Sequence, residues 1–293
     1  MRHKVDFVVV IPDSRDTNRG RKPYALAIAS ATLAIAAVGA GAAAPGAAPA
    51  RADDPPPLPR VSLYGDSIAL EASKWVKAAI TRSRPVQFSD RTLAASSPCD
   101  WQQMATQEAT TEPPAAVIAE VFVTNMSKCQ LDAKGKRAAD GSAAYMSRYG
   151  QDLENFINIY QDTTTQIFLA SAPPARNDIS RNKVSHKKSM VALLARVAAA
   201  HPNVTFVDAG AAVEPPGGGY VRSLPCLPSE QCPNRPKRGF ATVRALDGLH
   251  FCPTVLYATM ASLRSCPQTP LGAIRYAEAL SAGTISLLNR QAS

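Results

Sequence analysis

Short apolar runs alternate with longer stretches of helical periodicity along most of this 293-residue chain. Apolar runs that are bounded by Gly, Pro or Asp predict five strands, at residues 61–64, 86–93, 115–123, 166–172 and 203–207. The run AAVIAEVFV at 115–123 is almost continuously apolar, as in a parallel strand that is buried on both faces. Apolar residues three and four positions apart predict helices over 68–80, 101–109, 143–160, 187–200, 254–263 and 272–288.

Strands and helices in alternation predict one three-layer α/β/α domain, built around a five-stranded parallel sheet with right-handed crossovers. We expect this domain to occupy residues 61–293, after a Pro-rich lead-in at 53–60. No internal repeat and no second domain boundary interrupts the pattern. Within the domain, 125–141 is predicted to be a polar loop and 209–243 a long Pro- and Gly-rich loop.

The first 52 residues have the pattern of a secretory signal peptide. Basic residues precede an uncharged stretch of 21 residues at 24–44, and the sequence Ala50-Arg51-Ala52 then predicts cleavage after Ala52. The alternative is an uncleaved anchor, because 21 uncharged residues are long enough to span a bilayer. We therefore expect a secreted or extracytoplasmic protein, which contacts a membrane only if the leader is retained.

The formal charge of +9 is divided unevenly between the leader and the rest of the chain. Residues 1–52 hold seven Lys and Arg against three Asp and Glu, which leaves a net charge of +5 on residues 53–293. No basic cluster with interleaved aromatic residues occurs, so we expect no nucleic-acid partner. With 46% hydrophobic and 19% charged residues, the composition excludes a disordered chain.

All six cysteines follow the predicted leader, and an even number in an exported chain predicts three disulfides. Six cysteines allow about 15 pairings. Proximity along the chain favours Cys226–Cys232 and Cys252–Cys266, which leaves Cys99–Cys129. A zinc site is the weaker alternative, because the chain has no C-x-x-C and its four histidines are scattered. We expect neither a metal nor a cofactor.

Reactive side chains follow the first and the last predicted strands, at the sheet edge where parallel α/β proteins bind ligands. Ser67 stands between a strand and a helix N-terminus, and Asp247 precedes His250 by three residues. An Asp at that spacing holds one nitrogen of the imidazole ring and leaves the other free as a base. Ser67 alone also suits a helix cap, and His250 alone also suits a surface histidine. Together the three residues have the pattern of nucleophile, base and orienting group.

In order and spacing, Gly65-Asp66-Ser67-Ile68, Asn125 and Asp247-Gly248-Leu249-His250 resemble the motifs of the SGNH/GDSL hydrolase family, in its exported, disulfide-containing, actinobacterial-type members. The resemblance covers about residues 61–263. It implies a flavodoxin-like α/β/α fold and the hydrolysis of carboxylic esters. It also implies that Ser67 is the nucleophile, that His250 is the general base and acid, and that Asp247 orients His250.

The resemblance further implies an oxyanion hole made of the nucleophile's own N–H, a backbone N–H of the second motif and the side-chain amide of Asn125. The family has a glycine in the second motif where this chain has Ala94 or Ala95, and of the third motif only Asn125 is kept. Judged alone, Asn125 is an ordinary turn residue. Because Cys99 and Cys129 follow these two altered motifs, we expect a bridge between them to hold both oxyanion loops.

The loop at 209–243 is the expected lid on the substrate side, and the alternative is a plain surface loop braced by Cys226–Cys232. Its cations favour a polar or anionic substrate surface: Arg222, Arg235, Lys237 and Arg238. We expect a monomeric serine esterase that acts on short acyl esters of cell-envelope carbohydrates or glycolipids. Two alternatives remain, an O-acyltransferase that uses the same acyl-enzyme and a catalytically silent, carbohydrate-binding module with this fold.

Overall fold

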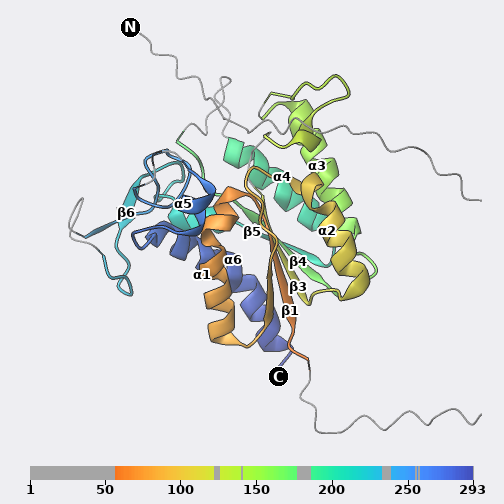
Figure 1. Cartoon of the computed structure of the whole chain (residues 1–293), viewed down its shortest axis with the longest axis horizontal. Helices are drawn as coiled ribbons and strands as arrows, with labels where there is room; N and C mark the ends of the chain where they lie inside the picture. The colour runs from red at the N-terminus through yellow and green to blue at the C-terminus, as the bar shows by residue number, and fades with distance from the viewer. Residues whose placement is uncertain are drawn as a thin grey trace, which may run out of the picture. The chain divides into compact units, whose positions relative to one another are not determined.

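A five-stranded parallel sheet forms the centre of the computed structural model, which describes residues 57–121, 126–139, 141–176, 186–232, 239–254, 256 and 258–292 (Figure 1). The predicted leader and its cleavage site lie outside these ranges. The strands lie in the order β2-β1-β3-β4-β5 and span Arg60–Tyr64 (β1), Gln87–Asp90 (β2), Ala116–Val121 (β3), Gln166–Ser171 (β4) and Val204–Val207 (β5). The predicted α/β fold is thus confirmed, with the flavodoxin-like strand order.

The strand order reverses between β1 and β3, which lie side by side in the middle of the sheet. Their register pairs Val61 with Ala116 and Tyr64 with Ala119. The chain leaves β1 toward β2 on one side and leaves β3 toward β4 on the other, so the loops beyond these two strands diverge. Such a divergence opens a crevice at the carboxyl ends of the strands, where ligands bind in folds of this kind.

Helices cover both faces of the sheet, and they span Ser67–Ser83 (α1), Pro98–Thr111 (α2), Ala143–Asn158 (α3), His186–Ala200 (α4), Met260–Arg264 (α5) and Leu271–Arg290 (α6). α1 and α6 lie on one face, and α2, α3 and α4 lie on the other (Figure 1). The alternation in β1 suits this arrangement, because Val61 and Leu63 pack toward α1 and α6 whereas Tyr64 packs with Trp101 and Phe156. Within the described ranges, no helix is both long and apolar enough to cross a membrane.

Two helices begin at residues that the hydrophobic pattern does not predict, and in both cases a capping interaction sets the start. α2 begins three residues early, at Pro98, because Ser97 and Asp100 form a capping box in which the Ser97 N–H donates to Asp100 Oδ2 at 2.8 Å. A helix is predicted over 254–263, but α5 begins only at Met260, because the Thr259 side chain caps the helix there. The prediction of a helix over the first part of that range is wrong for the described residues.

The segment 209–243 is not the irregular loop that its Pro and Gly content predicts. It contains a 3-10 turn at Ala209–Val213 (η2) and two short strands, Ser223–Pro225 (β6) and Phe240–Thr242 (β7), which pair antiparallel. The Cys226–Cys232 disulfide directly follows β6. The other two bridges are Cys99–Cys129 and Cys252–Cys266, so the three pairs are those that proximity along the sequence favours.

The turn from β1 into α1 depends on a close approach between Gly65 and the buried Glu120 of β3. A Cβ atom on Gly65 would lie 2.8 Å from Glu120 Oε2 and 2.4 Å from the Cβ of Ala69, so only glycine fits here. The Asp66 N–H donates to Glu120 Oε2 at 3.1 Å, and Asp66 Oδ1 accepts from the Ile68 N–H at 2.8 Å. Glu120 therefore holds the turn, and Asp66 caps the helix that follows it.

Both carboxyl groups of this turn are buried and titrate abnormally. Burial raises the pKa of Asp66 to about 6, against the hydrogen bond from Ile68 and the charge of His250. Burial, together with the neighbouring charge of Asp66, raises the pKa of Glu120 well above its usual value. Each group therefore keeps its proton to a higher pH in the folded chain than in the unfolded chain, so raising the pH favours unfolding.

The loop between β2 and α2 contains a strained residue, Ala95, whose φ of 61° is the one positive φ of a non-glycine residue among the described positions. Hydrogen bonds hold the loop on both sides of it. The Leu93 N–H donates to Gly65 O at 2.9 Å, and Ser96 Oγ donates to the same oxygen at 3.2 Å while accepting from Trp101 Nε1 at 2.8 Å. These contacts tie the loop to the β1–α1 turn and hold Ala95 in its left-handed conformation.

Glu120→Gln is expected to change how stability depends on pH. Glutamine keeps an acceptor for the Asp66 N–H but does not titrate, so it removes the loss of stability that begins above the unfolded-state pKa of about 4.3. Relative to the wild type, the variant should become more stable as the pH rises from about 4.5 to about 8, because only the wild type has a buried carboxyl group at position 120 that must ionise over this range. Urea unfolding at the two pH values measures this gain, and parallel pH profiles for both proteins would contradict it.

Ala95→Gly is expected to stabilise the chain by about 1 kcal/mol, because glycine adopts a positive φ without the clash that an alanine Cβ suffers. The matched control is Ala94→Gly, at a neighbour with no positive φ, which should lower stability or leave it unchanged. Thermal unfolding of the two variants beside the wild type gives the comparison. A loss of stability in Ala95→Gly equal to that of the control would show that the backbone here is not strained.

Candidate active site

Ser67 is the first residue of α1 and stands directly beyond the carboxyl end of β1. The N–H groups of a first helical turn have no partners within the helix and carry the positive end of the helix dipole. Asp66, not Ser67, supplies the N-cap of α1. The interpretation of Ser67 as a capping serine is therefore excluded, and its hydroxyl is available for another contact.

That contact is with His250, which comes from the other end of the domain. Ser67 Oγ and His250 Nε2 lie 3.0 Å apart, and His250 Nδ1 lies 2.7 Å from Asp247 Oδ2. His250 is almost buried, with 6% of the residue exposed, and Ser67 is half-buried. The structure thus brings the three predicted residues into one continuous chain of hydrogen bonds.

The electrostatics of Asp247 fix the direction of these hydrogen bonds. Burial by itself raises the pKa of Asp247, but hydrogen bonds from the His250 ring and from the backbone N–H groups of His250 and Leu249 outweigh it, so the pKa lies below its usual value. The two backbone bonds, at 3.0 and 2.8 Å, end on Asp247 Oδ1. An ionised carboxylate only accepts, so His250 Nδ1 carries the hydrogen and Nε2 faces Ser67 with its lone pair.

Backbone geometry also holds the loop that carries Asp247 and His250. Gly248 has a φ of 77°, and a Cβ atom there would lie 2.6 Å from the Cβ of Arg176, so this position requires glycine. Arg176 fastens the loop from the β4 side, because its N–H donates to Gly248 O at 2.8 Å and its guanidinium to Leu246 O at 2.8 Å. These hydrogen bonds hold the loop of Asp247 and His250 in one conformation.

Of the predicted oxyanion groups, the structure describes Ser67, Ala94 and Ala95, whereas Asn125 lies outside the described residues. Ala95 is half-buried and has the positive φ that glycine favours, whereas Ala94 is exposed and has no such conformation. Of the two alanines, Ala95 is thus the one with the backbone conformation that a glycine favours. Its loop contacts the β1–α1 turn through Gly65 O, which brings it to the same sheet edge as Ser67.

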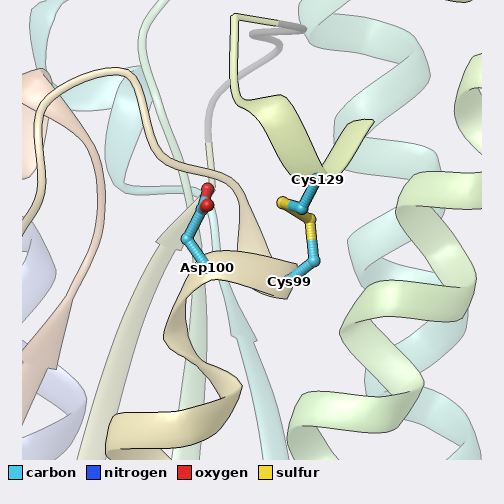
Figure 2. Close-up of side chains that lie close together, drawn as sticks. All are labelled: Cys99, Asp100 and Cys129. Atoms are coloured by element: carbon cyan, nitrogen blue, oxygen red, sulfur yellow. A yellow bond between two sulfur atoms is a disulfide. The ribbon is translucent and has the colours of Figure 1, made fainter. Parts of the chain in front are cut away.

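The Cys99–Cys129 disulfide joins the first turn of α2 to a 3-10 turn at Lys128–Gln130 (η1), as Figure 2 shows. Asp100 lies beside the two cysteines, but both sulfur atoms belong to the bridge, so this cluster is not a set of metal ligands. Gln130 then anchors η1 to α3, because its side-chain amide donates to Asp152 Oδ2 at 2.7 Å. The bridge thus links the loop of Ala95 to the segment that follows Asn125.

Sequence reasoning missed two buried charged residues behind His250. Glu71 of α1 accepts the backbone N–H groups of Phe251, at 2.7 Å, and of Cys252. Arg244 is 1% exposed, lies over the Phe251 ring at 5.2 Å and donates to Pro174 O at 3.3 Å, and burial lowers its pKa to about 10. The available signal for Glu71 was a charged residue one helical turn after Ser67.

Part of the segment 209–243 packs against Arg176, the residue that holds the His250 loop. The Tyr220 ring stacks with the Arg176 guanidinium at 5.7 Å, and both residues line a cavity of about 650 Å³ together with Lys187, Glu214 and Gly217. Lys187 is paired there with Asp208 and Glu214. Of the four predicted lid cations, the structure describes Arg222, and the others, Arg235, Lys237 and Arg238, lie outside the described residues.

Comparison with solved structures finds similar folds among enzymes that act on acyl groups. The peptidoglycan O-acetyltransferase A catalytic domain of Streptococcus pneumoniae is 13% identical, with 79% of this chain and 96% of that chain covered and a TM-score of 0.46. A GDSL-like lipase of Bacteroides thetaiotaomicron is also 13% identical, with 78% and 87% covered and a TM-score of 0.45. A carbohydrate esterase family 2 enzyme of Corynascus thermopiles is 11% identical, with 80% and 68% covered and a TM-score of 0.47.

Because the identities are low and the TM-scores are below 0.5, these structures do not establish the activity of this chain. That activity has to be inferred from the chain's own site. A search of the curated proteins gave no significant match. One family model matches, over residues 60–255, and its description is protein of unknown function, DUF459. The match takes in well over half of the chain and includes Ser67, Asp247 and His250. The chain therefore belongs to the DUF459 family.

Proposed function

We propose that this protein is a serine ester hydrolase of the SGNH type, in which Ser67, His250 and Asp247 form the catalytic triad. The observation that carries the proposal is the chain of contacts from Ser67 Oγ to His250 Nε2 at 3.0 Å and from His250 Nδ1 to Asp247 Oδ2 at 2.7 Å. Both distances are within hydrogen-bond reach, as nucleophile, base and orienting group require. The ionised Asp247 and the helix N-terminus at Ser67 supply the electrostatics that this chemistry needs.

In this mechanism Ser67 Oγ attacks the acyl carbonyl carbon while His250 Nε2 takes the hydroxyl proton. Asp247 stabilises the imidazolium that forms. The negative charge on the carbonyl oxygen is met by the backbone N–H groups of Ser67 and Ala95 and by the side-chain amide of Asn125. His250 then gives its proton to the leaving alcohol, and an acyl-enzyme remains on Ser67. Water, deprotonated by His250, attacks this ester, releases the acid and restores the serine.

The proposed substrates are short acyl esters of cell-envelope carbohydrates or glycolipids, and the proposed location is outside the cytoplasm. Three disulfides support this location, because such bonds persist in oxidising compartments. The cavity beside Arg176 has a mostly apolar lining that also includes the charged side chains of Lys187, Asp208 and Glu214, which can bind the hydroxyl groups of a polar alcohol.

Ser67→Ala is expected to lower kcat for p-nitrophenyl acetate by at least about 10³-fold, because no other group takes over the attack. The variant should also fail to react with a fluorophosphonate probe that labels the wild type. Ser73→Ala, on the same helix, is the matched control and should keep both properties. Hydrolysis by Ser67→Ala at the wild-type rate would exclude the mechanism, and a wild-type protein that neither hydrolyses esters nor labels would indicate a silent binding module.

Removal of the Cys99–Cys129 bridge by Cys99→Ser with Cys129→Ser is expected to lower kcat, because the two oxyanion loops lose their link. A partial loss of one oxyanion donor corresponds to about a tenfold fall. The control removes Cys226–Cys232, which braces the segment after β6 and closes a shorter loop, with a sequence separation of 6 rather than 30. Activity is measured well below the melting temperature of both variants, and equal kcat values in the two would contradict the role of the first bridge.

A further inference from the structure

Glu71 makes an unusual contact for a glutamate that lies one turn after the start of a helix. Its side chain is 3% exposed, and its two carboxyl oxygens accept backbone N–H groups from another part of the chain. Oε2 accepts from Phe251 at 2.7 Å, and Oε1 accepts from Cys252. These are the two residues that directly follow His250. We propose that Glu71 is a positioning residue that sets the distance between Ser67 and His250, an inference that rests on the proposed function.

The argument begins with the spacing on α1. Residues four positions apart lie on one face of a helix, about one turn and 6 Å apart along the axis. Ser67 and Glu71 stand at this spacing, and both face the loop that contains His250. The helix therefore touches this loop twice, through the imidazole ring at Ser67 and through the backbone after the histidine at Glu71.

The two contacts have different consequences. The hydrogen bond between Ser67 and His250 changes during the reaction, because the proton moves and Ser67 becomes acylated. The bonds to Glu71 involve only backbone N–H groups and persist throughout. A carboxyl group that holds two adjacent N–H groups fixes both the position and the orientation of the chain that leaves His250. Glu71 thus keeps the base near the nucleophile while their own hydrogen bond is broken.

Other contacts hold the same loop from different directions but do not connect it to α1 at this point. The Phe251 ring packs against Tyr276 of α6 at 5.3 Å, and the Cys252–Cys266 disulfide ties the loop to the segment before α6. Asp247 and Arg176 hold the part of the loop that precedes His250. Glu71 differs from these residues because it belongs to α1, the helix that bears Ser67.

The test compares Glu71→Ala and Glu71→Gln with changes at a second buried glutamate, Glu108 of α2. Glu108 is also 3% exposed, and it accepts from Ser62 Oγ at 2.6 Å and from Tyr64 Oη at 2.9 Å, on the opposite side of the sheet. Glu108→Ala and Glu108→Gln therefore remove a comparable buried acceptor without touching the loop. Each variant is measured for melting temperature and for kcat and KM with p-nitrophenyl acetate.

Glu71→Ala should lower kcat by about 10²-fold, the effect of a misplacement of about 1 Å, with KM changed by less than about threefold. Glu71→Gln should recover about tenfold of that loss, because its side chain keeps one acceptor oxygen of two. The Glu108 variants should have a lower melting temperature but keep the wild-type kcat.

If Glu71→Ala and Glu108→Ala lose kcat equally at equal loss of stability, the positioning role is excluded. Should Glu71→Ala not fold, Glu71→Gln decides the question: a fall in kcat at an unchanged KM supports the positioning role, and a wild-type kcat overturns it.

A crystal structure of the folded Glu71 variant separates this inference from the proposed function. Positioning predicts that the distance between Ser67 Oγ and His250 Nε2 exceeds the 3.0 Å of the intact chain. An unchanged distance overturns the inference even if the wild type is an active esterase. A lengthened distance in a protein whose wild type cleaves no ester would keep the positioning role and refute the proposed activity instead.

Discussion

The contact of the β1–α1 turn with Glu120 is the constraint on which the site depends. β1 and β3 pair side by side, and at their carboxyl ends the backbone of Gly65 passes so close to the Glu120 carboxyl group that no other residue fits. This contact fixes where α1 begins and therefore where Ser67 stands. The cost is a pair of buried acids under the helix N-terminus, whose raised pKa values make the turn sensitive to pH.

The other parts of the site are brought to this turn by contacts between distant segments. The loop of Ala95 hydrogen-bonds to Gly65, and the loop of His250 is held by Glu71 from the same helix that carries Ser67. Two disulfides join segments beside the site: Cys99–Cys129 links the start of α2 to η1, and Cys252–Cys266 links the loop of His250 to the segment before α6. The sheet supplies a rigid edge, and short polar contacts and covalent bridges align the loops on it.

The sheet was predictable from sequence because its signals are local. The apolar run at 115–123 and the shorter runs around it have the period and length of buried strands, and the order of the elements follows from their alternation. Ser67 directly follows β1, at the sheet edge where ligands bind, but β6 and β7 of the separate two-stranded sheet stand between β5 and His250. The meeting of His250 with Ser67 was therefore predictable from the motif pattern and not from a strand end. Motif resemblance added the roles, which stay predictions until activity is measured.

What could not be predicted depends on contacts between residues far apart in the chain. The positive φ of Ala95 arises from hydrogen bonds to Gly65, and no local pattern marks an alanine for that conformation. Glu71 resembles any helical glutamate until the backbone after His250 reaches it. The shortened α5 is a local error of another kind, because the Thr259 side chain caps the helix at a later residue than the apolar pattern predicts.

The separation between Ser67 and His250, 183 residues along the chain, has a consequence for biosynthesis. The serine leaves the ribosome early, whereas its base arrives when most of the polypeptide has already been made. Through that interval the hydroxyl has the reactivity of an ordinary alcohol, since neither imidazole nor carboxylate is there to activate it. The proposed esterase activity therefore requires the folded domain, because nucleophile and base meet only when the first and last parts of that domain have packed together.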